Sequence, residues 1–199
     1  DLSLSSGSAK LNGYEFDTAE FGLSSGNLDI GDIEANTVKI KMSSGKAAVK
    51  GLKVDMVKCT LLSGSLTMTD ITAEEAYIGT SSGSTELSGS IRNIDVSLSS
   101  GKMKIETDIM PSELNCTASS GRIEVAVPES AEGFTLDYKR SSGSIKTDFP
   151  LTGDILGNSG TAQYGEGKNK VTARVFISAH QLFQFQMGIV NCLGYFNVA

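Results

Sequence analysis

Apolar and polar residues alternate along most of the chain, in short runs that recur about every nineteen residues. Counted from a recurring glycine, apolar residues take the second and fourth positions after it, as in Leu28 and Ile30. Another set lies seven, five and three positions before the next such glycine, as in Val38, Ile40 and Met42. Spacing by two is the strand period, because successive side chains of a strand point to opposite faces. The pattern predicts two short strands per repeat, each with one apolar face.

A third apolar pair, such as Ile33 and Ala35, lies between these two strands and follows a corner of its own. This second corner consists of residues that tolerate positive φ or bond their own backbone. It reads Asn12-Gly13, Gly31-Asp32, Lys50-Gly51, Thr69-Asp70 and Ser88-Gly89 in successive repeats. Each repeat should therefore contain three strand segments and at least two bends.

The first corner is nearly always Ser-Ser-Gly. We predict its glycines to be the structural corner residues: Gly7, Gly26, Gly45, Gly64, Gly83, Gly101, Gly121 and Gly143, at intervals of 19, 19, 19, 19, 18, 20 and 22 residues. A weaker version, Asn158-Ser159-Gly160, follows. A fixed period near twenty residues is typical of solenoids, whose units bury their apolar faces against their neighbours. The sequence thus predicts an all-β fold, a β-solenoid (a right-handed single-stranded β-helix) with about nine coils of roughly 19 residues.

Two other folds explain the pattern less well. No segment sustains the three-and-four spacing of a helix, and Gly and Ser interrupt the chain too often for one. A two-sheet sandwich also has short alternating strands, but it would not require the same corner at one interval.

The repeat loosens toward the C-terminus. Insertions near 108–113, 127–133 and 149–157 are expected to form longer loops, and such loops often bind partners. The register demands another Ser-Ser-Gly at 176–178, but the sequence there is Phe-Ile-Ser. We therefore divide the chain into a repeat domain, 1–175, and a non-repeat apolar tail, 176–199, without Asp, Glu, Lys or Arg.

Three interpretations of this tail compete. It folds over the last coil as a cap, it binds a partner or a membrane, or it comes from an altered reading frame that replaced the final coils. We favour the third origin with capping as its structural result. The alternation of Phe183, Phe185 and Met187 adds one more strand in this interpretation.

Composition excludes several functions. The net charge of −6, the pI of about 4.8 and the lack of basic runs argue against nucleic acid as a partner. Cys59 and Cys116 share one inward column three coils apart, too far for a disulfide, so both are expected to be core residues. Cys192, in the tail, has no assigned partner.

No catalytic, cofactor-binding or metal-binding residue is predicted, and no cofactor. The one histidine, His180, lies in the tail, while the serines are explained by the corner. The outward position three after the corner glycine has mixed charge, which is typical of a solvated face: Lys10, Asp29, Ala48, Thr67, Glu86, Lys104, Glu124 and Lys146.

The iterated Ser-Ser-Gly corner, short strand, Gly/Asp corner and second strand resemble the bacterial toastrack β-repeat family, a domain of unknown function that carries an adhesin label. The resemblance covers residues 1–175 and is clearest from Leu23 to Gly143. It implies a β-solenoid outside the bacterial cell, often behind an N-terminal membrane segment and linked to envelope stress or adhesion. It brings no catalytic residues.

We accordingly expect a non-enzymatic binding, adhesion or envelope-sensing module at the cell surface or envelope. Its partner would be a protein or a cell-wall glycan, contacted by outward residues and the longer loops. A membrane would be reached only through an anchor absent from this sequence or through the tail. The alternatives are a carbohydrate-active β-helix enzyme, which needs carboxylates gathered on one face, and a structural spacer that self-associates through its coil ends.

Overall fold

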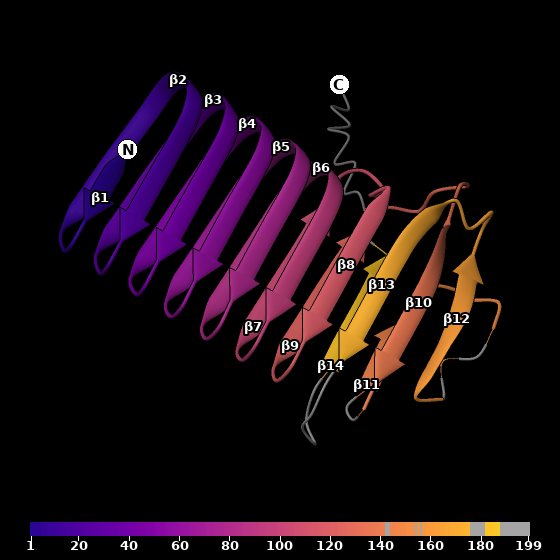
Figure 1. Cartoon of the computed structure of the whole chain (residues 1–199). Helices are drawn as coiled ribbons and strands as arrows, with labels where there is room; N and C mark the ends of the chain where they lie inside the picture. Colours follow the sequence, from indigo (N-terminus) through magenta and orange to yellow (C-terminus); the bar gives the residue numbers. More distant parts are fainter. Residues whose placement is uncertain (142–143, 154, 156, 176–181, 188–199) are drawn as a thin grey trace, which may run out of the picture.

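A computed structural model of the chain describes residues 1–141, 144–153, 155, 157–175 and 182–187. Its coils of about 19 residues stack into a β-solenoid of about seven turns, and the described residues contain no helix (Figure 1). The predicted β-solenoid fold class is confirmed, with about seven turns in place of the nine coils that the sequence predicted. The strands form one wound sheet: β1 (Leu2–Leu4), β2 (Ser8–Leu23), β3 (Asn27–Met42), β4 (Lys46–Leu61), β5 (Ser65–Thr80), β6 (Ser84–Leu98), β7 (Lys102–Thr107), β8 (Glu113–Ala118), β9 (Arg122–Val127), β10 (Phe134–Arg140), β11 (Ser144–Thr147), β12 (Ser159–Tyr164), β13 (Asn169–Val175) and β14 (Leu182–Met187).

The coils from β2 to β6 form the regular stack. Each of these strands runs around a coil and pairs in parallel with the next, for example Leu11 with Ile30, Ile30 with Val49 and Val49 with Met68. Each coil has three sides. In the coil of β2, face I follows the Ser-Ser-Gly corner and contains residues 8–12, the short turn face contains residues 14–17, and face II contains residues 18–23 and leads to the next Ser-Ser-Gly corner.

Stacking explains why the first corner needs glycine. Gly7, Gly26, Gly45, Gly64, Gly83, Gly101 and Gly121 all have positive φ, between 99° and 127°. A Cβ added at any of the last six would also overlap the backbone oxygen of the corner glycine one coil before it. Gly143 lies outside the described residues.

The second corner shows the alternation of glycine with aspartate that the sequence predicted. Gly13, Asp32, Gly51 and Asp70 stack at this corner, all with positive φ. The carboxylate of Asp32 occupies the space where Gly51 would place a Cβ. An aspartate in one coil therefore favours glycine in the next.

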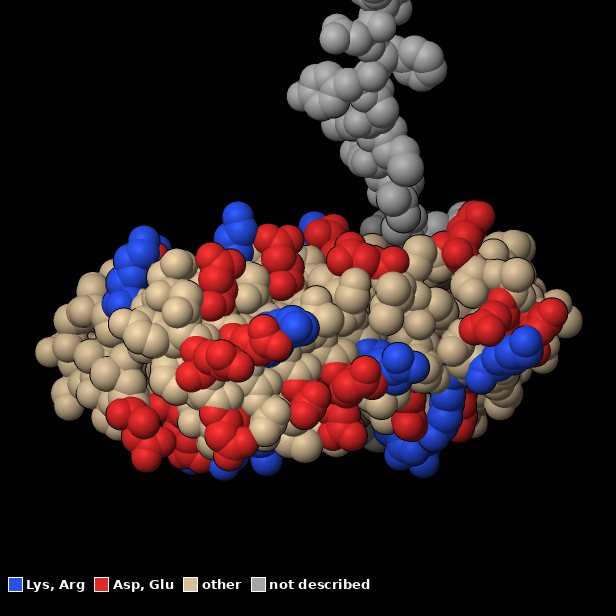
Figure 2. All heavy atoms as spheres, turned by 90° about the horizontal axis from the view of Figure 1, so that it is seen from above, with Lys and Arg blue, Asp and Glu red and all other residues tan. Residues whose placement is uncertain are grey.

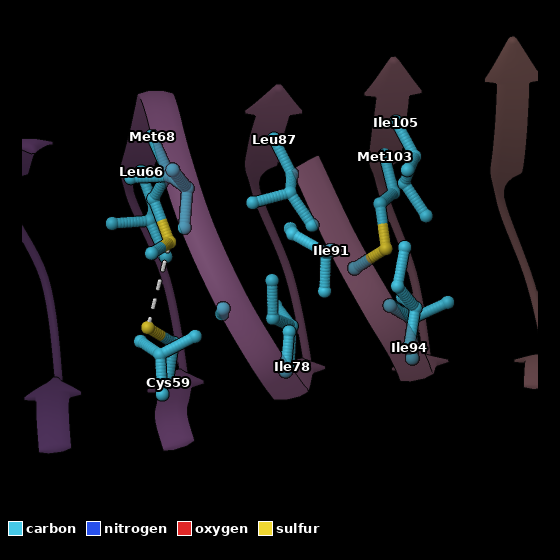
Figure 3. Packing of buried hydrophobic residues seen from close by; sticks show 14 of the residues in the cluster. Cys59, Leu66, Met68, Ile78, Leu87, Ile91, Ile94, Met103 and Ile105 are labelled. Carbon is cyan, nitrogen blue, oxygen red and sulfur yellow. Dashed lines mark hydrogen bonds between the residues drawn. The ribbon is translucent and has the colours of Figure 1, made fainter. Parts of the chain in front are cut away.

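The inward columns form one continuous core. Cys59 and Cys116 are both buried as predicted, and burial raises the pKa of the Cys59 thiol to about 12. The Cys59 Sγ lies 3.6 Å from the Met68 Sδ, which points at it from the other side of the coil (Figure 3). Two buried hydroxyls, Thr80 and Thr85, satisfy each other at 2.8 Å.

Beyond β6 the coils do not stack in sequence order. β13 pairs in parallel with both β8 and β10, and β14 pairs with both β9 and β11. Figure 1 shows β13 between β8 and β10, so a late segment separates two earlier coils. The inward side chains of β13, Val171, Ala173 and Val175, are buried there. Positions 176–178, where the register demanded a corner, lie outside the described residues.

One expectation from the sequence needs correction here. The weak ninth corner at Asn158-Ser159-Gly160 opens no parallel coil, because β12 pairs antiparallel with β10. β14 lies in the range 176–199 that the sequence assigned to the tail, and it pairs in parallel with β9 and with β11. It is the strand that the alternation of Phe183, Phe185 and Met187 predicted.

The two ends of the stack differ. At the far end, β12 flanks β10, and the rings of Phe134, Phe149 and Tyr164 pack together with centroids 4.8 to 5.6 Å apart. At the N-terminal end, β1 covers only Phe21 to Leu23 of the first coil. Tyr14 there is 52% exposed and stacks on Phe16.

Candidate binding groove

The turn face carries a groove that crosses five coils. Its volume is about 430 Å³; it begins at Glu15 and runs over the coils of β2 to β6, and Ile109 of the following coil closes its far end. With coils about 4.8 Å apart, five coils give a length of about 19 Å. The groove follows the solenoid axis.

The floor of the groove is a column of apolar side chains. Phe16, Ala35, Val54 and Ala73 stack in register, one per coil. The last three are 8%, 7% and 6% exposed, whereas most core side chains are less than 4% exposed. The small side chains keep this floor low enough to be reached from solvent.

Two outward columns flank this floor, because the residues before and after each floor position point away from the core. One column is Glu15, Glu34, Lys53, Thr72 and Ser90, and the other is Asp17, Asn36, Asp55, Glu74 and Arg92. Both therefore present polar side chains to whatever lies over the apolar floor.

Neighbouring coils are tied together along these columns. The Lys53 ammonium lies 2.8 Å from the Glu34 carboxylate, and this hydrogen bond raises the pKa of Lys53. The Arg92 guanidinium lies 2.7 Å from Glu74. These contacts fix the positions of both cations beside the floor.

Carboxylates outnumber cations in the lining. Among the described residues, Glu15 and Asp55 line the groove without a salt bridge, and the charge of Glu15 contributes to the raised pKa of Lys53. Figure 2 views this side of the molecule, where Asp and Glu side chains gather with a few Lys and Arg between them. The groove offers hydrogen-bond donors and acceptors over an apolar strip.

The three loops that the sequence predicted to bind a partner lie at different places relative to the groove. Of the 108–113 loop, Ile109 closes one end of the groove and Asp108 approaches Ser90. The 127–133 loop is instead covered by residues 165–168. Of 149–157, Phe149 is part of the core, and positions 154 and 156 lie outside the described residues.

Sequence reasoning did not single out the two groove columns. A signal for them was present in the repeat, because both columns lie two and four positions after the second corner. The mixed-charge column from Lys10 to Lys146 lies on face I, away from the groove, and includes the 3.3 Å ion pair of Lys10 with Asp29.

Within the part of the chain that the structure describes, no group of three His, Cys, Asp or Glu side chains is placed to hold a metal ion. No described helix is long and apolar enough to cross a membrane. His180 and Cys192 lie outside the described residues.

A wound parallel sheet with a stacked glycine corner and a groove along its turns defines a repeat protein of the β-solenoid class. Within that class the chain belongs to the Toastrack DUF4097 family, whose model matches residues 4–176. The predicted resemblance is thereby confirmed. No curated protein and no solved structure is similar enough to match the chain.

Proposed function

We infer that this protein is a non-enzymatic binding module of the bacterial cell envelope, and that its ligand lies along the turn-face groove. The observation that carries this proposal is the groove itself, with polar columns on both sides of an apolar floor. The toastrack resemblance supports the envelope location that we propose. The Toastrack family itself is a domain of unknown function.

The shape of the groove favours an extended ligand. Each coil repeats the same arrangement about 4.8 Å further along, so a linear chain meets similar contacts along its length. A sugar chain has hydroxyl groups for the Glu, Asn, Thr and Ser side chains, and apolar ring faces for the Ala35–Ala73 floor. We therefore favour a linear cell-wall glycan over a folded protein partner.

Co-sedimentation tests this function directly. The full chain is mixed with purified bacterial wall and membrane fractions, and its fraction in the pellet is measured at rising salt. We expect salt-resistant pelleting with wall. Thr72→Trp places a bulky ring in the groove without touching the core and should abolish pelleting. Thr67→Trp, on face I of the same coil, is the matched control and should pellet like the parent chain. Equal pelleting of both variants would refute the groove as the binding site.

A carbohydrate-active enzyme is the second candidate function, because the fold gathers carboxylates along the groove of the turn face. A carbohydrate-active enzyme would use two of Glu15, Glu34, Asp55 and Glu74. Glu34 and Glu74 are 60% and 58% exposed and are paired with cations, whereas a general-acid carboxyl is normally desolvated. Release of reducing sugar from wall glycan that Glu15→Gln abolishes would establish the enzyme and replace the binding proposal.

A further inference from the structure

A second hollow lies opposite the turn face, where face II of the first coils meets the Ser-Ser-Gly corner. Its volume is about 440 Å³, and it shares no lining residue with the groove. We call it the corner hollow. One outward residue near the end of each strand from β1 to β4 lines it in register: Ser3, Gly22, Lys41 and Thr60.

Gly22 leaves the space at the centre of this column. Its φ lies outside the left-handed region, so the backbone does not require glycine there. A Cβ added to Gly22 would come no closer than 3.5 Å to another residue, the nearest atom being the Ser3 Oγ. β2 and β3 pair through this position without a bulge. A glycine within a regular strand weakens it, and here it indicates that another group approaches the backbone closely.

Two lysines at this hollow form no salt bridge with the residues that the structure describes. Lys41 lines the hollow, and Lys58 is its diagonal neighbour on β4, because Lys41 pairs with Thr60. Lys58 also lies directly opposite Lys39, whose ammonium is 2.6 Å from the Glu20 carboxylate. Like charges on opposite residues of a sheet are destabilising. A bound anion would offset this repulsion.

The nearest carboxylates do not fill this role in the corner hollow itself. Asp1 and Glu20 line a separate hollow of about 300 Å³, which adjoins the first at Gly22. Among the described residues that line the corner hollow, Lys41 is the one charged side chain. An anion that enters there meets a cation and no carboxylate.

The other lining residues indicate what kind of molecule carries this anion. Hydroxyl groups line the hollow along all four coils, from Ser3, Ser5, Ser24, Ser43 and Thr60. Leu62 takes the place of the first serine of its corner, is 54% exposed, and offers an apolar contact. Lysine binds phosphate as a point charge, and Ser and Thr donate hydrogen bonds to phosphate oxygens. No aromatic side chain among the described lining residues is available for a nucleobase to stack on.

We propose that the corner hollow binds a phosphodiester group of a linear polyol phosphate polymer. The phosphate approaches the Gly22 backbone beside Lys41, with Lys58 as the second cation. The polyol chain runs across the coils between the corner serines and Leu62. Four coils at about 4.8 Å span about 14 Å, which is longer than one phosphate and suits a chain. This site is separate from the turn-face groove and does not depend on it.

Calorimetry with a short synthetic poly(glycerol phosphate) tests the charge. We expect the full chain to bind it, with an affinity that falls as salt rises. Lys41→Gln should weaken binding at least about tenfold. Lys46→Gln is the matched control, because Lys46 follows the same corner, forms no salt bridge with a described residue and lies outside the hollow. Absence of binding by the parent chain, or equal affinities of the two variants, would overturn the proposal.

A pair of glycine variants tests the space without removing a charge. Gly22→Val fills the hollow, whereas Gly79→Val adds the same side chain to the same outward column outside it. A Cβ at Gly79 meets only the Ser97 Oγ, at 3.4 Å, so both positions accept a side chain. Both variants should keep at least the parent's urea midpoint, because valine favours strands. Only Gly22→Val should lose binding, and a Gly22→Val chain that binds the polymer like the parent would overturn the site.

A single-stranded DNA oligonucleotide of equal charge distinguishes this site from a general attraction of phosphates. It carries phosphodiesters, but its bases find no stacking partner in the hollow. We expect it to bind at least about tenfold more weakly than the poly(glycerol phosphate). Equal affinity for both polymers, unchanged by Gly22→Val, would show charge attraction alone and contradict the proposal.

Discussion

The regular stack from β2 to β6 and the strands from β7 to β14 use the same alternation, but they reach their order differently. In the regular stack each coil pairs with the coil 18 or 19 residues away, so position in space follows position in sequence. In the distal part, β13 pairs with β8 and β10 across gaps of 57 and 35 residues. A repeat therefore specifies what kind of surface a coil can stack on, but it does not specify which coil supplies that surface.

The largest expected effect comes from a charge placed between layers. Ile40→Asp buries an unpaired carboxylate where the side chain is 1% exposed, and should cost at least about 4 kcal/mol of unfolding free energy. Ala173→Asp should instead remove protection only in the distal strands, because neighbour-only stacking limits the damage. Amide hydrogen exchange separates the two. Loss of protection throughout residues 8–98 in Ala173→Asp would show that the regions are one unit.

Glycine corners give the next largest contrast. Gly64→Ala should cost about 3 kcal/mol, because φ is 108° and the new methyl group overlaps the Gly45 backbone oxygen. Gly167→Ala should cost about 1 kcal/mol, because its methyl group meets only the flexible Gln163 side chain. Gly79→Ala, without positive φ, is the control and should be nearly neutral. Urea unfolding measures all three, and equal losses would mean that stacking adds nothing to the corner.

Alkaline pH probes the regular stack through Cys59. Burial raises its pKa from 9.0 to about 12, so below pH 9 the thiol is protonated in both folded and unfolded chains. Between pH 9 and 12 the unfolded chain releases this proton and the folded chain keeps it. Stability should therefore fall by about 1.4 kcal/mol per pH unit from this thiol. Cys59→Ala should reduce the slope of the unfolding free energy against pH by about 1.4 kcal/mol per pH unit, and the remaining slope includes the buried Cys116 thiol, whose pKa burial also raises. An unchanged slope would contradict the assignment.

The smallest loss of stability is expected at the second corner, where glycine and aspartate alternate from coil to coil in the regular stack. Gly51→Asp places a carboxylate where the Asp32 side chain already lies, and should cost about 1 kcal/mol. Gly51→Asn has nearly the same shape without the charge, and it separates this crowding from a charge effect. Thermal unfolding compares the two variants, and a neutral Gly51→Asp would show that the alternation is not steric.

How far the sequence predicts the site is seen in the groove columns. Residues such as Glu15 and Lys53 are exposed polar residues, no different in pattern from those of face I. The groove exists because Ala35 and Ala73 are small and because the short turn face brings two outward columns close together. That proximity is a property of the folded coil, and the sequence marks the two columns only by their spacing from the second corner.

The repeat in the sequence is enough to specify the coil, since the Ser-Ser-Gly period and the spacing by two set the corners and the inward columns. Those rules act within about twenty residues and depend on backbone conformation and side-chain direction. The order of the distal coils, by contrast, is established only in the folded chain. Val171, Ala173 and Val175 fit against any apolar column, so local pattern cannot choose among the layers. The choice was made by contacts distant in sequence: the long 128–133 connection, the antiparallel β12, and the crossing of residues 165–168 over the end of β10.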